Sequence, residues 1–500
     1  MAMLEYLMYG FKVVFIPSNF LWLTLGCFLG TVIGMLPGLG PATGIALLLP
    51  LTFVMKPETA LITMCAIFYG AMFGGSRSSI LLNIPGDGSA VASCFDGYPM
   101  TLKGEAEVAL AISAIASFIG GLISSIAFVL LALPLAKIAL MFGPPEYFAL
   151  MVLALTATAS MSEGKVLKGL LSMALGLMVS MVGLDPQSGV SRFTFGNLEL
   201  QGGIDFVVVI IGIYGLGEVF KNLEKIGRGE MLQPIKKKFG KIWITKEQWK
   251  RSLVPMLRAT PIGFLIGILP GAGGTIAALM SYNVEKRLSK EPERFGKGAI
   301  EGLAAPEAAN NACSIGAILP TLTLGIPGSG TAAIMLGALM IYGLQPGPLL
   351  FEFYPEIGWG VVASLFVGNF IAAVMNLPLA GLLVRILAIP PKILYPLITA
   401  LCFIGVYAIN LSVVDFYLLI LFGLLGYAMR KFEIPTAPMI LASVVGRKFE
   451  QSFRQSLMIS GGDFSIFFKS AISVTLLILA VLSLVYPTVS AALKKKRHAV

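Results

Sequence analysis

Polar residues that can bind a small solute cluster around four places where the chain should interrupt a helix. Each place combines proline with glycine inside an apolar stretch, and proline breaks a helix because it lacks an N–H and clashes with the preceding turn. A helix that starts after such a break has free backbone N–H groups, which attract anions. Nearby hydroxyl and amide side chains add direct hydrogen bonds. This chemistry suits a carboxylate, and the carbonyl ends of the broken helices suit a small cation such as Na⁺.

The four breaks form two matching pairs. Gly34–Gly40 contains Leu-Pro-Gly and returns 233 residues later as Gly267–Gly273, whereas Ile84–Ser89 contains Ile-Pro-Gly and returns 242 residues later as Ile326–Thr331. Broken helices in corresponding positions of two halves are the best sequence indication of a transport site. Two structural repeats are therefore predicted. Inverted repeats are favoured, with parallel repeats as the alternative. For any single pair of small residues, close helix packing is the competing explanation.

The predicted substrate site is made from residues at and beside these breaks. Its members are Gly38, Gly40, Thr43, Arg77, Asn83, Pro85, Gly86, Ser89, Gly271, Gly273, Thr275, Asn310, Asn311, Gly328, Ser329 and Thr331. Arg77 could bind a substrate carboxylate through its forked guanidinium, or it could serve the fold by pairing with an acid or reaching the surface.

Three acidic residues near the breaks have competing interpretations. Asp87 is predicted to couple an ion, as a cation ligand or a proton carrier, with helix capping as the alternative. Glu307 is a site acid or a helix-start residue, and the helix-start interpretation is favoured. Asp96, followed by Gly-Tyr-Pro, predicts an Asx-type turn at the membrane edge.

The elements that position these residues must be membrane helices. Hydrophobic residues make up 57% of the 500 residues, charged residues only 12%, and the mean hydropathy is +0.87. A soluble domain carries roughly twice that share of charge. Many apolar runs approach the roughly 20 residues that cross a bilayer. We therefore predict an all-α polytopic membrane protein with about 10–14 membrane segments, including broken helices or re-entrant hairpins.

The distribution of charge along the chain predicts its division into segments and its orientation in the membrane. The predicted divisions are an interfacial or membrane helix at 1–17, repeat one at 18–220, a basic linker at 221–252, repeat two at 253–450, and a last span with a basic tail at 451–500. The net charge is +10, and residues 221–258 hold eleven basic and three acidic residues. The positive-inside rule places this linker and the tail in the cytoplasm. Contact with membrane lipid is expected, and nucleic-acid binding is not.

Motifs for other chemistries are missing from the sequence. It has no P-loop and no His-Glu-x-x-His motif, and its one histidine, His498, lies in the tail. The five cysteines lack the spacing of a metal site or a disulfide framework. We expect no enzyme activity, no cofactor and no metal beyond a Na⁺ site. The coupling ion is predicted to be Na⁺ or H⁺.

Several segments together resemble the TctA family, the large membrane subunit of the tripartite tricarboxylate transporters. The segments are Gly34–Gly44, Gly74–Pro99, Arg192–Gly196, Gly267–Thr275, Ala305–Ala312 and Pro435–Ala442. The resemblance implies a multi-pass carrier of the bacterial inner membrane. It also implies ion-driven carboxylate uptake with a small four-helix membrane subunit and a periplasmic solute-binding protein. Arg77 and Asp87-Gly88 depart from the family's pattern beside the predicted site.

Two other functions remain open from the sequence. An ion or solute channel would need an open lined path and would show flux without coupling. A membrane scaffold subunit would translocate nothing itself. A neighbouring gene for a secreted binding protein, together with one for a short four-span protein, would favour the transporter.

Overall fold

The computed structural model describes the chain except residues 1, 37–38, 84, 161–165, 186, 229–241, 272, 378–390 and 498–500. The described residues are almost all helical. Their one sheet is an antiparallel pair of two-residue strands, β1 (Gly183–Leu184) and β2 (Ser191–Arg192). The predicted all-α class is therefore confirmed.

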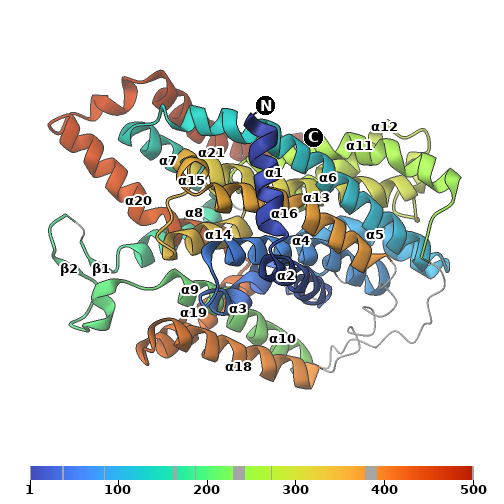
Figure 1. Cartoon of the computed structure of the whole chain (residues 1–500), viewed down its shortest axis with the longest axis horizontal. Coiled ribbons are helices and arrows are strands. Elements are labelled where there is room, and N and C mark those ends of the chain that lie inside the picture. The colour runs from blue at the N-terminus through green and yellow to red at the C-terminus, as the bar shows by residue number, and fades with distance from the viewer. Residues whose placement is uncertain are drawn as a thin grey trace.

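The part of the chain before the basic linker forms helices of very different lengths (Figure 1). They are α1 (Ala2–Val14), α2 (Pro17–Met35), α3 (Pro41–Thr52), α4 (Pro57–Leu82), η1 (Gly88–Ala90), α5 (Val91–Leu102), α6 (Ala106–Ala139), α7 (Pro144–Ser160), α8 (Val166–Ser180), η2 (Glu199–Gly202), α9 (Phe206–Ile210), the π-helical η3 (Ile211–Leu216) and α10 (Gly217–Gly227). The long apolar run after Ala106 is a single continuous helix.

The part after the linker has a similar alternation of long and short helices. They are α11 (Lys246–Ile268), α12 (Gly273–Leu288), η4 (Pro292–Arg294), α13 (Ile300–Leu324), α14 (Gly330–Ile341), α15 (Pro348–Phe353), α16 (Pro355–Asn376), α18 (Pro391–Asn410), α19 (Val414–Lys431), α20 (Ala437–Ile459), η6 (Phe464–Phe468) and α21 (Ala471–Arg497).

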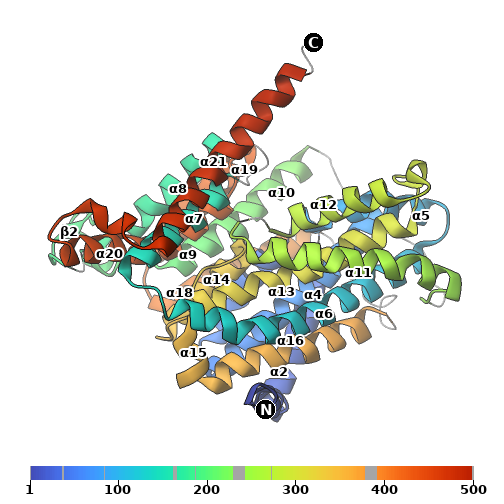
Figure 2. The same ribbon diagram turned by 90° about the horizontal axis from the view of Figure 1, so that it is seen from above.

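Two groups of helices pack side by side (Figure 2). In the first group, α2 packs on α4, α11 packs on α13, and α6 and α16 join them. In the second group, α20 packs on α7 and α8, α21 packs on α7, and α19 packs on η3. The short helices α3 and α14 contact both groups, since α3 touches α4 and η3 and α14 touches α4 and α20. A site beside these short helices therefore lies where the two groups meet.

Small residues bring the long helices of the first group close together. A side chain at Gly30 of α2 would place its Cβ 2.3 Å from the backbone oxygen of Ile67 in α4. Between α11 and α13, a Cβ at Gly263 would lie 2.1 Å from the backbone oxygen of Ala309. No carbon atom fits at these distances. Close backbone packing of this kind is how membrane helices associate without a hydrophobic driving force.

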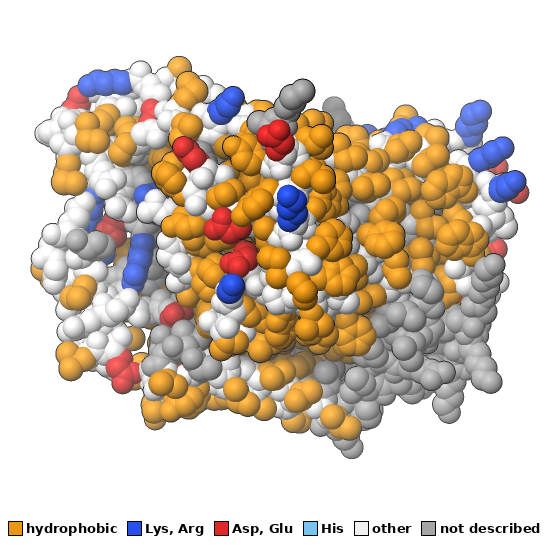
Figure 3. All heavy atoms as spheres, viewed as in Figure 1, with side chains coloured by type: hydrophobic (Ala, Val, Ile, Leu, Met, Phe, Trp, Pro, Cys, Tyr) orange, Lys and Arg blue, Asp and Glu red, His pale blue; other side chains and the backbone are white. Residues whose placement is uncertain are grey.

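Length and apolar composition identify membrane-spanning candidates. Five helices in the described residues meet both criteria: Pro17–Met35, Pro57–Leu82, Ala106–Ile138, Phe206–Glu224 and Pro355–Asn376. Figure 3 shows a broad hydrophobic surface on one face, interrupted by few charged side chains. These features confirm a polytopic membrane protein, whereas the number of crossings and the repeat relationship stay predictions.

Candidate functional site

Helices end and restart at all four Pro-Gly motifs. The interruptions lie between α2 and α3, between α4 and η1, between α11 and α12, and between α13 and α14. At the second break of each half the long helix ends in a left-handed residue, Asn83 with φ 57° and Gly325 with φ 71°. These two residues are 242 positions apart. A left-handed C-cap of this kind stops the helix and turns the chain sharply.

The glycine of each Ile-Pro-Gly motif packs against backbone. A Cβ at Gly86 would lie 2.3 Å from the oxygen of Gly34, and a Cβ at Gly328 would lie 2.3 Å from the oxygen of Gly267. Gly86 and Gly328 are separated by 242 residues, and Gly34 and Gly267 by 233 residues. These separations are the same as those of the two motif pairs. The two glycines therefore allow each loop to lie directly on the end of a neighbouring helix. Their predicted approach to a solute stays a prediction.

A pocket of about 170 Å³ lies where the interrupted segments meet. It is lined by Pro41 and Ala42 of α3, Phe68 and Met72 of α4, Asp87, Gly88 and Ser89 at η1, Tyr214 of η3, Gly273, Gly274 and Thr275 of α12, Asn310, Cys313, Ser314 and Ala317 of α13, Ser329, Gly330 and Thr331 at α14, and Ala437 of α20. The first residues of α3, η1, α12 and α14 all contribute to this lining. Their N-terminal ends supply partial positive charge to the pocket.

Seven of the residues predicted from the sequence line this pocket. They are Asp87, Ser89, Gly273, Thr275, Asn310, Ser329 and Thr331. The two halves touch directly here. A Cβ at Gly88 would lie 2.7 Å from Oγ1 of Thr275, and a Cβ at Gly274 would lie 2.8 Å from Cβ of Ser89. The structure therefore brings breaks from both halves to one place.

Asp87 is the one charged side chain among the described residues that line the pocket. Its Oδ1 accepts from the Ser89 hydroxyl at 2.6 Å and from the Ala90 N–H at 3.2 Å. Ser329 occupies the corresponding position in the other half and accepts from the Ala332 N–H at 3.2 Å. Both residues are thus helix caps.

Asn310 holds an unsatisfied polar atom beside the pocket. Its side chain is 2% exposed, and its Oδ1 has no hydrogen-bond partner. Buried polar atoms nearly always have partners, so an orphan in a pocket points to a missing ligand. An amide can offer its oxygen to a cation or, after a half-turn, its NH₂ group to a carboxylate.

Tyr214 lines the pocket but was missed by the sequence reasoning. It lies in the π-helical turn η3, and π-helical turns are frequent at functional sites. The widened turn exposes backbone carbonyls that other helices bind. Thr43 donates to the Tyr214 oxygen at 3.3 Å, and Arg430 donates to the Ile213 oxygen at 2.7 Å. The glycines around Tyr214 in Ile-Gly-Ile-Tyr-Gly were the available signal.

Arg77 does not line the pocket. Its side chain is 1% exposed and points among α4, α6 and α16. The guanidinium donates to the Oδ1 and the backbone oxygen of Asn376, at 3.2 and 2.7 Å, and to the Leu110 oxygen at 3.3 Å. These bonds join three helices of the first group. Of the two roles open to Arg77, this placement corresponds to the structural one, although it is not an ion pair with an acid.

Eight other predicted residues do not line the pocket. They are Gly40, Thr43, Asn83, Pro85, Gly86, Gly271, Asn311 and Gly328. Asn311 donates instead to the backbone oxygen of Glu307 at 3.2 Å. Gly38 lies outside the described residues.

Two acidic residues differ from their predicted settings. Glu307 lies in the second turn of α13, beyond the helix start, and its carboxylate binds serine side chains. Asp96 lies within α5 and not in a turn. The predicted turn was wrong because Pro99 is accommodated inside the helix, which continues to Leu102.

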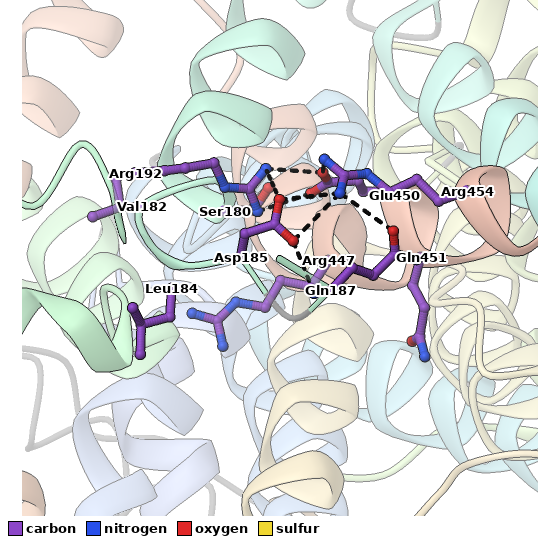
Figure 4. Close-up of a pocket in the computed structure, with 10 residues that line it drawn as sticks. All are labelled: Ser180, Val182, Leu184, Asp185, Gln187, Arg192, Arg447, Glu450, Gln451 and Arg454. Atoms are coloured by element: carbon purple, nitrogen blue, oxygen red, sulfur yellow. Dashed lines mark hydrogen bonds and ion pairs between the residues drawn. The ribbon is translucent and has the colours of Figure 1, made fainter. Parts of the chain in front are cut away.

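A second cluster of charged residues holds the β1–β2 hairpin on α20 (Figure 4). Arg192 binds Glu450 at 2.8 Å, and Arg454 binds Asp185 at 3.0 Å and Glu450 at 2.6 Å. The N–H of Gln187 also binds Asp185, and this bond is the main cause that lowers the Asp185 pKa to about 2. This network belongs to the loop between α8 and α9 and is separate from the pocket.

Comparisons with known proteins agree with the motifs. The tripartite tricarboxylate transporter TctA family matches residues 20–441. An uncharacterized 52.8 kDa protein of Agrobacterium vitis, from the TAR-I ttuC′ 3′ region, is 42% identical over 477 residues, covering 95% of this chain and 94% of its own.

A second A. vitis protein, uncharacterized and from the TAR-II ttuC′ 3′ region, is 43% identical over 215 residues, covering 43% of this chain and 89% of its own. No solved structure matches significantly. The match across most of the chain identifies it as a member of the TctA family of tripartite tricarboxylate transporters.

Proposed function

We propose that this protein is the translocating subunit of a secondary active transporter that imports a carboxylate into a bacterial cell through the inner membrane. A Na⁺ or H⁺ gradient drives the uptake. A periplasmic solute-binding protein delivers the carboxylate, and a small four-helix membrane subunit completes the complex. Membership of a tripartite transporter family supports this proposal. The two halves act as structural repeats that each supply two helix interruptions to one substrate site.

The observation that carries the proposal is the pocket at which the interrupted helices meet. Helix N-termini and neutral groups, including Ser329, Thr331 and Thr275, surround it. Such a lining binds an anion through N–H and O–H donors and leaves it able to depart, since no fixed basic side chain among the described lining residues holds it. A transporter must release what it binds, so moderate affinity is an advantage.

Asp87 explains why uptake would need a co-transported cation. At an effective dielectric constant of about 20, a carboxylate about 4 Å from an ionised Asp87 would be disfavoured by about 4 kcal/mol. A Na⁺ ion or a proton on Asp87 removes that repulsion. Binding of the cation and of the carboxylate therefore favour each other, which is the requirement for symport.

The test compares two neighbouring asparagines. Asn310→Leu removes the orphan amide from the pocket without breaking a hydrogen bond of the orphaned oxygen. Asn311→Leu is the matched control, because Asn311 is equally buried but lies outside the lining. A lost bond to a charged ligand is worth about 1.5–3 kcal/mol, so Asn310→Leu should lower the apparent affinity for the carboxylate about ten- to a hundredfold.

The measurement is uptake of a radiolabelled carboxylate panel, including citrate, by cells that contain all three subunits. Uptake per molecule of membrane-inserted protein should fall for Asn310→Leu and stay close to wild type for Asn311→Leu. Equal uptake by both variants would remove the pocket from the transport path. Flux that equilibrates the carboxylate without accumulating it would indicate a channel.

A further inference from the structure

Glu307 is a buried carboxylate held almost entirely by serine hydroxyls. Its side chain is 1% exposed and lies in α13 among α4, α5 and α6. Ser76 of α4 donates to it at 2.7 Å, and Ser117 of α6 donates at 3.3 Å. Ser93 of α5 and Ser113 of α6 bind it as well. An ionisable side chain at such a position in a membrane protein is expensive and usually functional.

The chemistry of these partners differs from that around Asp96, a buried acid of α5. Oδ1 of Asp96 accepts from the backbone N–H groups of Gly296, Gly298 and Ala299 at 2.7–2.9 Å. Backbone N–H groups can only donate, so they fit the acceptor oxygens of a carboxylate. A serine hydroxyl can donate or accept. The cage around Glu307 therefore satisfies both the carboxylate and the protonated acid.

The charges around Glu307 leave it free to change its protonation state. Arg77 of α4 is the nearest cation, but its guanidinium donates to Asn376 and Leu110, and the described residues include no ion pair with Glu307. On α5 the neighbouring titratable group is Cys94.

Two arginines of α11 have acidic partners of their own. On α11, Arg258 pairs with Glu285 of α12, and Arg251 pairs with Glu301 at the start of α13. Asp87 lies across the pocket and binds Ser89. None of these groups locks Glu307 in one charge state.

Glu307 is also close to the substrate pocket along two elements. It precedes Asn310, which lines the pocket, by three residues on α13, or about one helical turn. Its partner Ser93 follows Ser89, another lining residue, by four residues. A change in the charge of Glu307 therefore alters the electrostatic potential about one helical turn away, at the pocket proposed to bind the anion.

We propose that Glu307 carries a co-transported proton. The inference rests on the proposed transport function and names the proton as a coupling ion. A proton from the outer solution forms an O–H bond with the Glu307 carboxylate, a serine hydroxyl turns to accept from it, and the same O–H bond breaks when the proton leaves toward the cytoplasm. Protonation removes one negative charge beside the pocket. The protonated state then binds a carboxylate more tightly, and the bound carboxylate favours protonation.

A spectroscopic titration tests proton binding without transport. The purified protein in lipid nanodiscs is titrated from about pH 5 to about pH 9. The infrared carbonyl band of protonated carboxyl groups is followed during the titration. Wild type should show a band that titrates in this range and grows when citrate is added. Glu307→Gln, which keeps the shape, should lack it, and Asp87→Asn should keep it. A Glu307 band that does not change with pH, or no such band, would overturn the inference.

The transport experiment separates this inference from the proposed function. Proteoliposomes with all three subunits are given either a pH gradient or a Na⁺ gradient and labelled citrate. The inference predicts accumulation driven by the pH gradient in wild type, and loss of that drive in Glu307→Gln while citrate–citrate exchange continues. Accumulation with Na⁺ alone, unaffected by pH, would refute the role of Glu307 and keep the proposed function. Accumulation of none of the carboxylate panel with either gradient would refute the proposed function itself.

Discussion

Replacing Asp96 by alanine should strongly destabilise the packing of α5 against the start of α13. Asp96 is 0% exposed and binds three backbone N–H groups that precede α13. Its second oxygen accepts from the Tyr282 hydroxyl of α12 at 3.0 Å. The carboxylate thus accepts hydrogen bonds from the N–H groups at the start of a helix that belongs to a different segment of the chain. Without it these N–H groups lose their acceptor inside the protein.

The size of the effect follows from those bonds. Each hydrogen bond to a charged group contributes about 1.5–3 kcal/mol, and removing one member of a buried charged arrangement typically costs about 3–5 kcal/mol. We take about 3–5 kcal/mol for Asp96→Ala, because water can reach some of the freed N–H groups. Tyr282→Phe is the matched control. It removes only the hydroxyl bond to the carboxylate and should cost about 1.5 kcal/mol.

The assay is reversible unfolding of the purified protein in mixed micelles with increasing denaturing detergent, followed by circular dichroism. Asp96→Ala should lower the free energy of unfolding by at least twice the effect of Tyr282→Phe. A loss below about 1 kcal/mol for Asp96→Ala would show that the three N–H bonds contribute far less than a buried charged cap should.

Three further perturbations test other parts of the structure. Gly328→Val should prevent folding because its Cβ would lie 2.3 Å from the Gly267 oxygen, whereas Gly202→Ala, with no atom within 4 Å, should leave the yield of monodisperse protein unchanged. Tyr214→Phe should raise the KM for the carboxylate several-fold with little change in maximal rate, if its hydroxyl contributes about 1 kcal/mol to binding. The lowered pKa of Asp185, about 2, stabilises the fold above the ordinary carboxyl pKa of about 4, and this contribution should disappear as the pH falls through that interval. As the pH falls, the temperature of thermal unfolding should therefore decrease less in Asp185→Asn than in wild type. An equal decrease in both proteins would contradict the stabilising role of Asp185.

The sequence predicted the helix breaks and much of the pocket because proline and glycine act locally. Pro-Gly inside an apolar run interrupts a helix whatever surrounds it, so the positions of Ser89, Thr275 and Ser329 near helix starts were accessible from the sequence. The recurrence of the motifs also predicted one shared site. Their meeting at one pocket depends on how the long helices pack, which spacing along the chain does not define.

The sequence could not decide the role of residues whose contacts are tertiary. Arg77 has the chemistry of a carboxylate ligand, but its position on α4 directs it toward Asn376 of α16, about 300 residues later. Asp96 appears beside turn-forming residues, yet its carboxylate serves a distant helix start. Tyr214 was missed because the π-turn that presents it has no firm sequence signature. In each case the decisive partner comes from another segment of the chain.

The central claim is that a carboxylate binds where the four interrupted segments meet. The most direct measurement is an electron cryo-microscopy map of the complete complex with and without citrate. The account predicts added density in the pocket, in contact with Asn310 and Thr275 from one half and Ser89 from the other. Citrate density at another place between the helices, with this pocket unchanged, would contradict the account.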